Sequence, residues 1–126
     1  MKERRGEKKP KFWGKLASVD LVGCNDKISK PKEIRRFCDE LCKKIKMKKY
    51  GPTHLKRFGV GKLEGYSFMQ FIETSSITAH FEEQQNPKKA FIDIFSCKDF
   101  DEKEAADFCI DFFGAEKAKL RVLIRE

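Results

Sequence analysis

The stretch IETSSITAHF, residues 72–81, alternates apolar and polar side chains, which is typical of a half-buried β-strand. On a regular strand every second side chain faces the same side of the sheet. Ile77, Ala79 and Phe81 would therefore face a core. The side chains between them, which include His80 and two hydroxyls, would line the opposite face. The stretch thus predicts an antiparallel strand with one apolar and one polar side.

Five further segments have the composition of strands. Apolar, β-branched or aromatic runs that end in glycine or polar turns predict strands in residues 14–24, 53–58, 66–72, 90–95 and 120–124. The run AFIDIF at 90–95 is rich in Phe and Ile, so we expect it to lie in the centre of the sheet.

Two segments have the periodicity of amphipathic helices. Apolar residues recur at steps of three and four from Ile34 to Ile45, after a start near Ser29 and with an end predicted near Lys48. A second helix is predicted to begin after a capping Asp101 and to stop at Gly114.

The order of these elements is strand, helix, three or four strands, helix and strand, with short connections. This order predicts an α+β fold, a two-layer sandwich in which an antiparallel sheet has two helices packed on one face.

The chain has 126 residues and a net charge of +8, and half of that charge lies in residues 1–11, which hold six Lys or Arg and two Glu. We expect residues 1–12 to be a disordered basic tail, either merely solvated or in loose contact with a polyanion, and residues 13–126 to form a single domain. Neither an apolar run of about eighteen residues nor a secretory signal is evident, so a cytoplasmic protein without membrane spans is expected.

The five cysteines form no CxxC pair, and reduced thiols are expected. Cys38 and Cys42 could share a helix face as metal ligands, but with only His54 and His80 elsewhere we expect them to be core residues and predict no metal site.

Several motifs in this order, GKLASVDLVGC, HLKRF, GYS followed eight residues later by TSSITAH, FIDIFSC and the final helix-Gly-Ala-strand, resemble the small prokaryotic S-adenosylmethionine decarboxylases. The likeness runs from about Gly14 to Arg125. It implies a two-layer α+β sandwich that cuts its own backbone before a serine and converts that serine into a covalent pyruvoyl group. It also implies a homodimer of cleaved protomers.

Carried over by position, the resemblance implies cleavage between Thr74 and Ser75, with Ser75 as the precursor of the pyruvoyl cofactor that forms a Schiff base with the substrate. Ser67 corresponds to a second serine that assists cleavage, and His80 to the histidine that transfers protons during processing. Ser76 is an alternative nucleophile. Because residues 75 and 80 face opposite sides of an ideal strand, a bend or bulge is expected near the bond to be cut.

For decarboxylation, the resemblance implies that Cys97 is the proton donor and that Phe58 stacks on the adenine of the substrate. The chain departs from the family where Thr-Trp-Pro-Glu usually follows the histidine, because it has residues 81–84, FEEQ, at that place. Glu82 or Glu83 is therefore expected either to reach the ribose or amine of the substrate or to be a solvated turn residue. A second departure is Thr74, where the family usually has Glu.

The sequence hence favours a self-processing, pyruvoyl-dependent decarboxylase of S-adenosylmethionine that supplies the aminopropyl donor for spermidine synthesis. The alternatives are an arginine or ornithine decarboxylase on the same scaffold, since specificity comes from pocket contacts, an unprocessed relative that acts as a binding partner, or a basic nucleic-acid-binding domain. Nucleic acid is the weaker alternative, because the aromatic residues follow core periodicities and leave no evident stacking platform.

Overall fold

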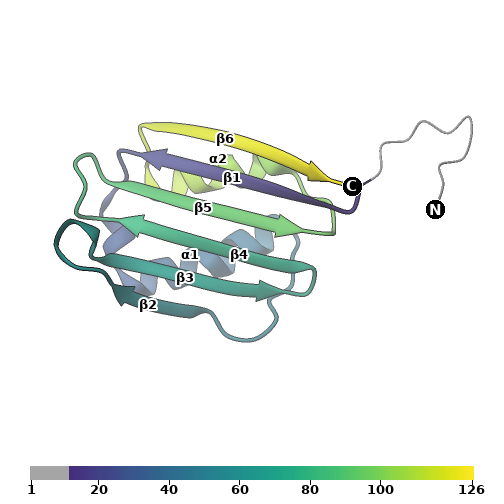
Figure 1. Cartoon of the computed structure of the whole chain (residues 1–126), viewed down its shortest axis with the longest axis horizontal. Coiled ribbons are helices and arrows are strands. Elements are labelled where there is room, and N and C mark those ends of the chain that lie inside the picture. Colours follow the sequence, from purple (N-terminus) through teal and green to yellow (C-terminus); the bar gives the residue numbers. More distant parts are fainter. Residues whose placement is uncertain (1–11) are drawn as a thin grey trace, which may run out of the picture.

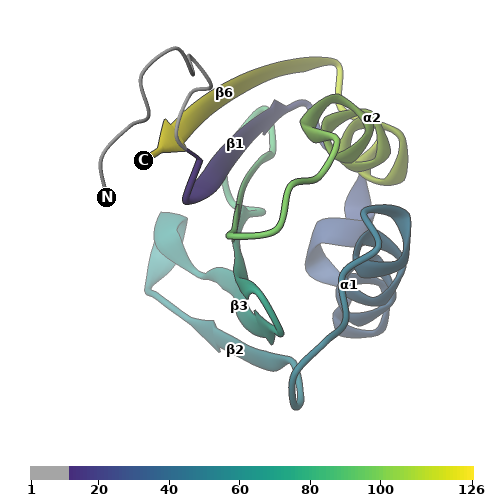
Figure 2. The same ribbon diagram turned by 90° about the vertical axis from the view of Figure 1, so that its right-hand side faces the viewer.

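A computed structural model describes residues 12–126 and contains one six-stranded antiparallel sheet with two α-helices on one face (Figures 1 and 2). Its elements are β1 (Gly14–Val22), η1 (Asp26–Ser29), α1 (Pro31–Lys44), β2 (His54–Phe58), η2 (Gly61–Leu63), β3 (Gly65–Ile72), β4 (Ser75–Glu82), β5 (Lys89–Ser96), α2 (Glu102–Phe113) and β6 (Lys117–Arg125). The predicted α+β sandwich is confirmed. Most of the predicted basic tail, residues 1–11, lies outside the described residues.

The strands lie in the order β2-β3-β4-β5-β1-β6, and every neighbouring pair is antiparallel. The predicted central strand, β5, lies in the interior between β4 and β1. Figure 2 shows that α1 and α2 cover the same face of the curved sheet. We call the other side the open face; it is formed by alternate residues of the strands, among them Leu16, Ser67, Met69, Phe71, Ser76, His80, Phe91 and Leu123.

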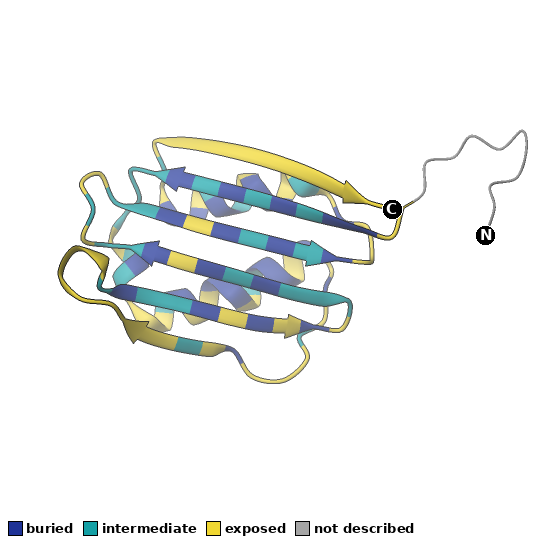
Figure 3. Ribbon diagram, in the orientation of Figure 1, coloured by how far each residue is buried: buried dark blue, intermediate teal, exposed yellow. Residues whose placement is uncertain are grey.

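The core lies between the helices and the sheet, and burial alternates along the inner strands (Figure 3). The predicted core positions of the quoted stretch, Ile77, Ala79 and Phe81, are all buried. Aromatic rings join the two layers: the ring centroids of Phe81 and Phe113 are 5.3 Å apart, and those of Phe37 and Phe113 are 4.6 Å apart. Close packing of this kind fixes the helices over the strands.

The predicted capping residues mark both ends of α2. Asp101 accepts a hydrogen bond from the backbone N–H of Glu104, and Gly114 takes the left-handed conformation at the end of α2, as predicted. α1 ends at Lys44 and not near Lys48. The prediction overran because Lys46 adopts a left-handed φ of 60°, which reverses the chain although no glycine marks the position.

The quoted stretch contains a turn as well as a strand. β3 ends at Ile72, two turn residues follow, and β4 begins at Ser75. From the pair Ile72–Ser75 to the pair Ser67–His80 the register is unbroken. The chain does bend next to the expected cleavage bond, at this tight turn, but the strand from Ser75 to His80 is regular. The expectation that a distortion there would bring Ser75 and His80 to one face is therefore wrong.

Candidate functional site

The Ser67–His80 pair lies on the open face of the sheet. The two residues are directly opposite each other on β3 and β4, and Ser67 Oγ lies 2.8 Å from His80 Nδ1. His80 is exposed, so its ring is accessible from solvent. The structure thus brings together two of the residues that were expected to share a role, and a hydroxyl bonded to an imidazole can transfer protons.

The expected cleavage bond, between Thr74 and Ser75, lies at the turn between β3 and β4. The carbonyl oxygen of Thr74 accepts a hydrogen bond from the backbone N–H of Cys97 (3.1 Å). A donor at this position polarises the carbonyl and stabilises negative charge on its oxygen. The contact joins the expected cleavage bond to the expected proton donor, although 22 residues separate Ser75 from Cys97 in the sequence.

A second contact at this turn was not foreseen from the sequence. The hydroxyls of Thr74 and Ser96 are 2.8 Å apart, and Ser96 is completely buried. The backbone N–H of Lys98 donates to Ser96 Oγ (2.9 Å). The only sequence signal for Ser96 is its place in FSC, immediately before Cys97. We call Thr74, Ser75, Ser96 and Cys97 the cleavage group.

The segment after α1 supports the same turn from the helix side. The N–H of Glu73 donates to the carbonyl of Lys48 (2.9 Å), and Thr74 Oγ1 donates to the sulfur of Met47 (3.4 Å). Met47 is buried. The turn is therefore fixed by contacts to two other parts of the chain.

The cleavage group and the Ser67–His80 pair lie at opposite ends of β4. Ser75 and His80 are five residues apart on a regular strand, which corresponds to roughly 16 Å at about 3.3 Å per residue. They also occupy strand positions of opposite parity, because Ser75 shares the parity of buried Ile77. One protomer alone therefore does not bring these residues together. Ser76, the alternative nucleophile, belongs to the open face opposite Phe71.

The expected substrate-binding residues lie at the His80 end of the sheet. Phe58 is the last residue of β2, pairs with Gly65, and has 59% of its surface exposed. Glu83 forms a two-pronged ion pair with Arg57 (2.8 and 3.2 Å). Glu82 has the strand parity of the open face. Glu83 is therefore engaged within the protein, and Glu82 is the carboxylate better placed for a ligand.

A buried lysine secures the loop that follows Cys97. Lys15 Nζ donates to the carbonyl of Phe100 and to Glu102 (2.6 Å each), and it lies 2.7 Å from Asp99. Burial lowers the pKa of Lys15, but the hydrogen bonds to Asp99 and Glu102 raise it by more, so the net pKa is raised. These contacts join β1 to the second half of the loop and to the start of α2.

The remaining cysteines lie away from the cleavage group. Cys38 and Cys42 are buried, and the Cys38 thiol lies 3.8 Å from the side-chain oxygen of Gln70. Burial raises the pKa of Cys24 to about 11. Within residues 12–126 no three His, Cys, Asp or Glu side chains lie together as a metal site would require. The helices of the same part of the chain are too short or too polar to cross a membrane.

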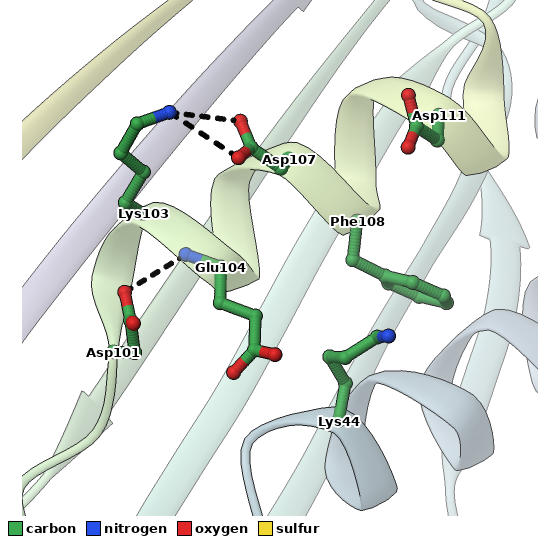
Figure 4. A pocket seen from close by; sticks show the side chains of 7 residues that line it. All are labelled: Lys44, Asp101, Lys103, Glu104, Asp107, Phe108 and Asp111. Atoms are coloured by element: carbon green, nitrogen blue, oxygen red, sulfur yellow. Dashed lines mark hydrogen bonds and ion pairs between the residues drawn. The ribbon is translucent and has the colours of Figure 1, made fainter.

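A shallow groove between α1 and α2 lies on the helix side of the molecule (Figure 4). It is lined by Lys44, Asp101, Lys103, Glu104, Asp107, Phe108 and Asp111. No residue of the cleavage group or of the Ser67–His80 pair lines it, so we do not regard it as the active site.

Comparison with known proteins shows a family and a fold that the chain resembles. Residues 15–126 match the family model described as S-adenosylmethionine decarboxylase. The fold is similar to the crystal structure of the adenosylmethionine decarboxylase from Aquifex aeolicus VF5, with a TM-score of 0.76, 24% sequence identity and 92% of each chain covered. No curated protein sequence gave a significant match.

Proposed function

The chain belongs to the S-adenosylmethionine decarboxylase family of carboxy-lyases, and on that premise we propose that it cuts itself between Thr74 and Ser75 and decarboxylates S-adenosylmethionine. The product would be the aminopropyl donor for polyamine synthesis, including spermidine. The observation that carries this proposal is the hydrogen bond from the Cys97 N–H to the Thr74 carbonyl, 3.1 Å long. It supports the proposal because this N–H could stabilise negative charge on the Thr74 carbonyl oxygen, and because it belongs to Cys97, the proposed proton donor.

Self-cleavage begins when the Ser75 hydroxyl attacks the Thr74 carbonyl carbon. The oxygen–carbon bond forms, negative charge collects on the carbonyl oxygen, and the Cys97 N–H stabilises it. The carbon–nitrogen bond then breaks as the nitrogen gains the proton that the Ser75 hydroxyl has given up, which leaves an ester. Loss of the Ser75 α-proton expels the Thr74 carboxylate. Hydrolysis of the resulting dehydroalanine releases ammonia and leaves a pyruvoyl group at the start of residues 75–126.

The residues around Ser75 suit this cofactor. The pyruvoyl group would supply a carbonyl that condenses with the α-amine of the substrate and accepts the electrons released with carbon dioxide. Cys97, whose side chain is exposed, would give a proton to the substrate carbon. Phe58 and Glu82 lie at the other end of the sheet, so those of a second copy of the chain would stack on the adenine and accept hydrogen bonds from the ribose.

We further propose that the working unit is a homodimer in which the Ser67–His80 pair of one copy serves the cleavage group of the other. The separation of roughly 16 Å along β4 supports this arrangement. The open face also exposes large apolar side chains: Met69 is 53% exposed, and Phe71 and Leu123 are each 52% exposed. Such a surface favours contact with another protein surface. Two open faces related by a twofold axis would bring opposite ends of the two sheets together.

Denaturing mass spectrometry of the purified protein tests cleavage. We expect two chains, residues 1–74 and 75–126, the second without a free amino terminus, and a single intact chain for Ser75→Ala. Carbon dioxide release from labelled S-adenosylmethionine, arginine and ornithine then identifies the substrate. An intact wild-type chain would exclude self-processing, and release from arginine or ornithine alone would exclude S-adenosylmethionine.

Co-expression tests the dimer. A tagged His80→Ala chain should remain uncut alone and should be cut when an untagged Ser75→Ala chain is present, because the second chain supplies the missing histidine. If His80 acts within its own chain, the tagged chain will stay uncut in both samples.

A further inference from the structure

We propose that Ser96 is a positioning residue for self-cleavage: its hydroxyl holds the side chain of Thr74 while the turn that it forms directs the Cys97 N–H at the Thr74 carbonyl. The inference rests on the proposed function, which assigns the cut to the bond between Thr74 and Ser75. It adds a residue and a role to that reaction.

Ser96 has the burial and position that this role requires. It is the last residue of β5, it has no exposed surface, and it lies directly opposite Ser75 in the register of β4 and β5. Directly opposed residues of an antiparallel pair have Cβ atoms about 5 Å apart. A hydroxyl buried at that position must be hydrogen-bonded, because an unpaired one would destabilise the fold.

The hydrogen bonds of Ser96 form a directed chain. The N–H of Lys98 can only donate, so Ser96 Oγ accepts at 2.9 Å. Ser96 can then donate its own proton to Thr74 Oγ1, 2.8 Å away, or to the sulfur of Met47 at 3.9 Å, and the shorter contact is the better hydrogen bond. Thr74 in turn donates to the sulfur of Met47 at 3.4 Å. The hydroxyls of Ser96 and Thr74 thus each have hydrogen-bond partners on two sides, and these contacts fix the rotamer of Thr74.

The same arrangement fixes the backbone of Cys97. A hydrogen bond from residue 98 to the side chain of residue 96 closes a serine turn around Cys97. Its N–H thereby meets the Thr74 carbonyl at 3.1 Å. Residues 96–98 thus hold both the side chain and the carbonyl of Thr74. The Ser75 hydroxyl can attack that carbonyl only if the carbonyl is held in the right orientation. Misplacement of reacting groups by about 1 Å can lower a rate about 100-fold.

The test follows cleavage of freshly synthesised full-length chain with time. We expect Ser96→Ala to slow the conversion about 10- to 100-fold and Ser96→Thr, which keeps the hydroxyl, to restore most of the rate. Thr74→Val should slow cleavage as well. The double variant should be no slower than the slower single variant, because both substitutions break the same hydrogen bond.

The outcomes separate this inference from the proposed function. If the wild-type chain is not cut, the proposed function fails. If the wild-type chain is cut and Ser96→Ala is cut equally fast, or if the two single effects multiply in the double variant, only the inference fails. A general loss of stability is measured separately, as the Tm of each variant in an uncut Ser75→Ala background, and would slow cleavage only by lowering the fraction of folded chain. Should Ser96→Ala fail to fold, the same assay uses the partly exposed turn residue Thr74. Thr74→Val should slow cleavage and Thr74→Ser, which keeps the hydroxyl, should not; equal rates for the two variants would contradict the inference.

Discussion

Replacing Lys15 by Met should destabilise the domain by about 2–3 kcal/mol near neutral pH, since charge-assisted hydrogen bonds at a buried site are lost. The Lys15 side chain is only 7% exposed, and its ammonium group contacts the carbonyl of Phe100, Glu102 and Asp99 within 2.7 Å. Met keeps most of the packing of the aliphatic stem. The substitution therefore measures what the charged ammonium group contributes to the free energy of unfolding.

The magnitude follows from how exposed each partner is. The carbonyl of Phe100 would lose its buried donor, which costs about 1–3 kcal/mol. Asp99 is 75% exposed and Glu102 is 36% exposed, so solvent screening limits each of these ion pairs to about 0–1 kcal/mol. The variant no longer has to bury an ammonium group, and this gain offsets part of the loss. The net of about 2–3 kcal/mol corresponds to a fall in Tm of about 6–12 °C for a domain of this size.

The effect should depend on pH. Hydrogen bonds from Lys15 lower the pKa of Asp99 and of Glu102, so their stabilisation is present above the ordinary values of 3.8 and 4.5 and is lost as the pH falls through the lower folded values. Lys15 has a raised pKa, so its contribution is present below 10.5 and is lost as the pH rises through the folded value. The difference in the free energy of unfolding between wild type and Lys15→Met should therefore be largest between about pH 5 and pH 10 and should become smaller in acid.

Thermal denaturation of both proteins in a Ser75→Ala background gives the measurement, because an uncut chain unfolds as one molecule. Lys103→Met is the matched control: its pair with Asp107, at 3.2 Å, is exposed on both sides, and a change below about 0.5 kcal/mol is expected. The reasoning is refuted if Lys15→Met melts within about 2 °C of its parent at pH 7, or if the difference persists undiminished at pH 3.

Three further predictions follow from single positions. Lys46→Gly should raise stability by about 0.5–1 kcal/mol in thermal denaturation, because Lys46 has a φ of 60° that glycine adopts without strain; an unchanged or lower Tm contradicts this. Gly65→Ala should cost about 1–3 kcal/mol in the same assay, since its Cβ would lie 2.3 Å from the carbonyl oxygen of Phe81; a neutral effect would show that the strands separate easily there. Phe58→Ala should raise KM for S-adenosylmethionine about tenfold or more through lost stacking and leave Tm nearly unchanged because the ring is exposed; an unaltered KM would remove Phe58 from the adenine site.

Most of the fold could be predicted from local patterns. The alternation at residues 76–81 identified the buried face of β4, and Asp101 and Gly114 marked the ends of α2. The errors arose where distant contacts or unusual backbone geometry override local preference. Lys46 reverses the chain without a glycine, and the turn at residues 73–74 interrupts a stretch that alternates like a continuous strand.

For the candidate site, the sequence predicted the residues but not their arrangement in space. Its residue types and spacings, Ser67, Ser75, His80 and Cys97, were recognisable in the sequence through the family resemblance. Their arrangement was not. The sequence predicted a distortion that would join Ser75 to His80, whereas the regular ladder keeps them at opposite ends of β4.

By itself, then, the sequence determined which side chains face the core, where the helices begin, and which family its motifs resemble, because these features repeat over a few neighbouring residues. Only the tertiary structure decided that the Thr74 carbonyl meets the Cys97 N–H and that Ser96 lies opposite Ser75. Those contacts depend on the register between β4 and β5, which is set jointly by turn length and by the packing of the whole sheet. No local pattern in the chain encodes them.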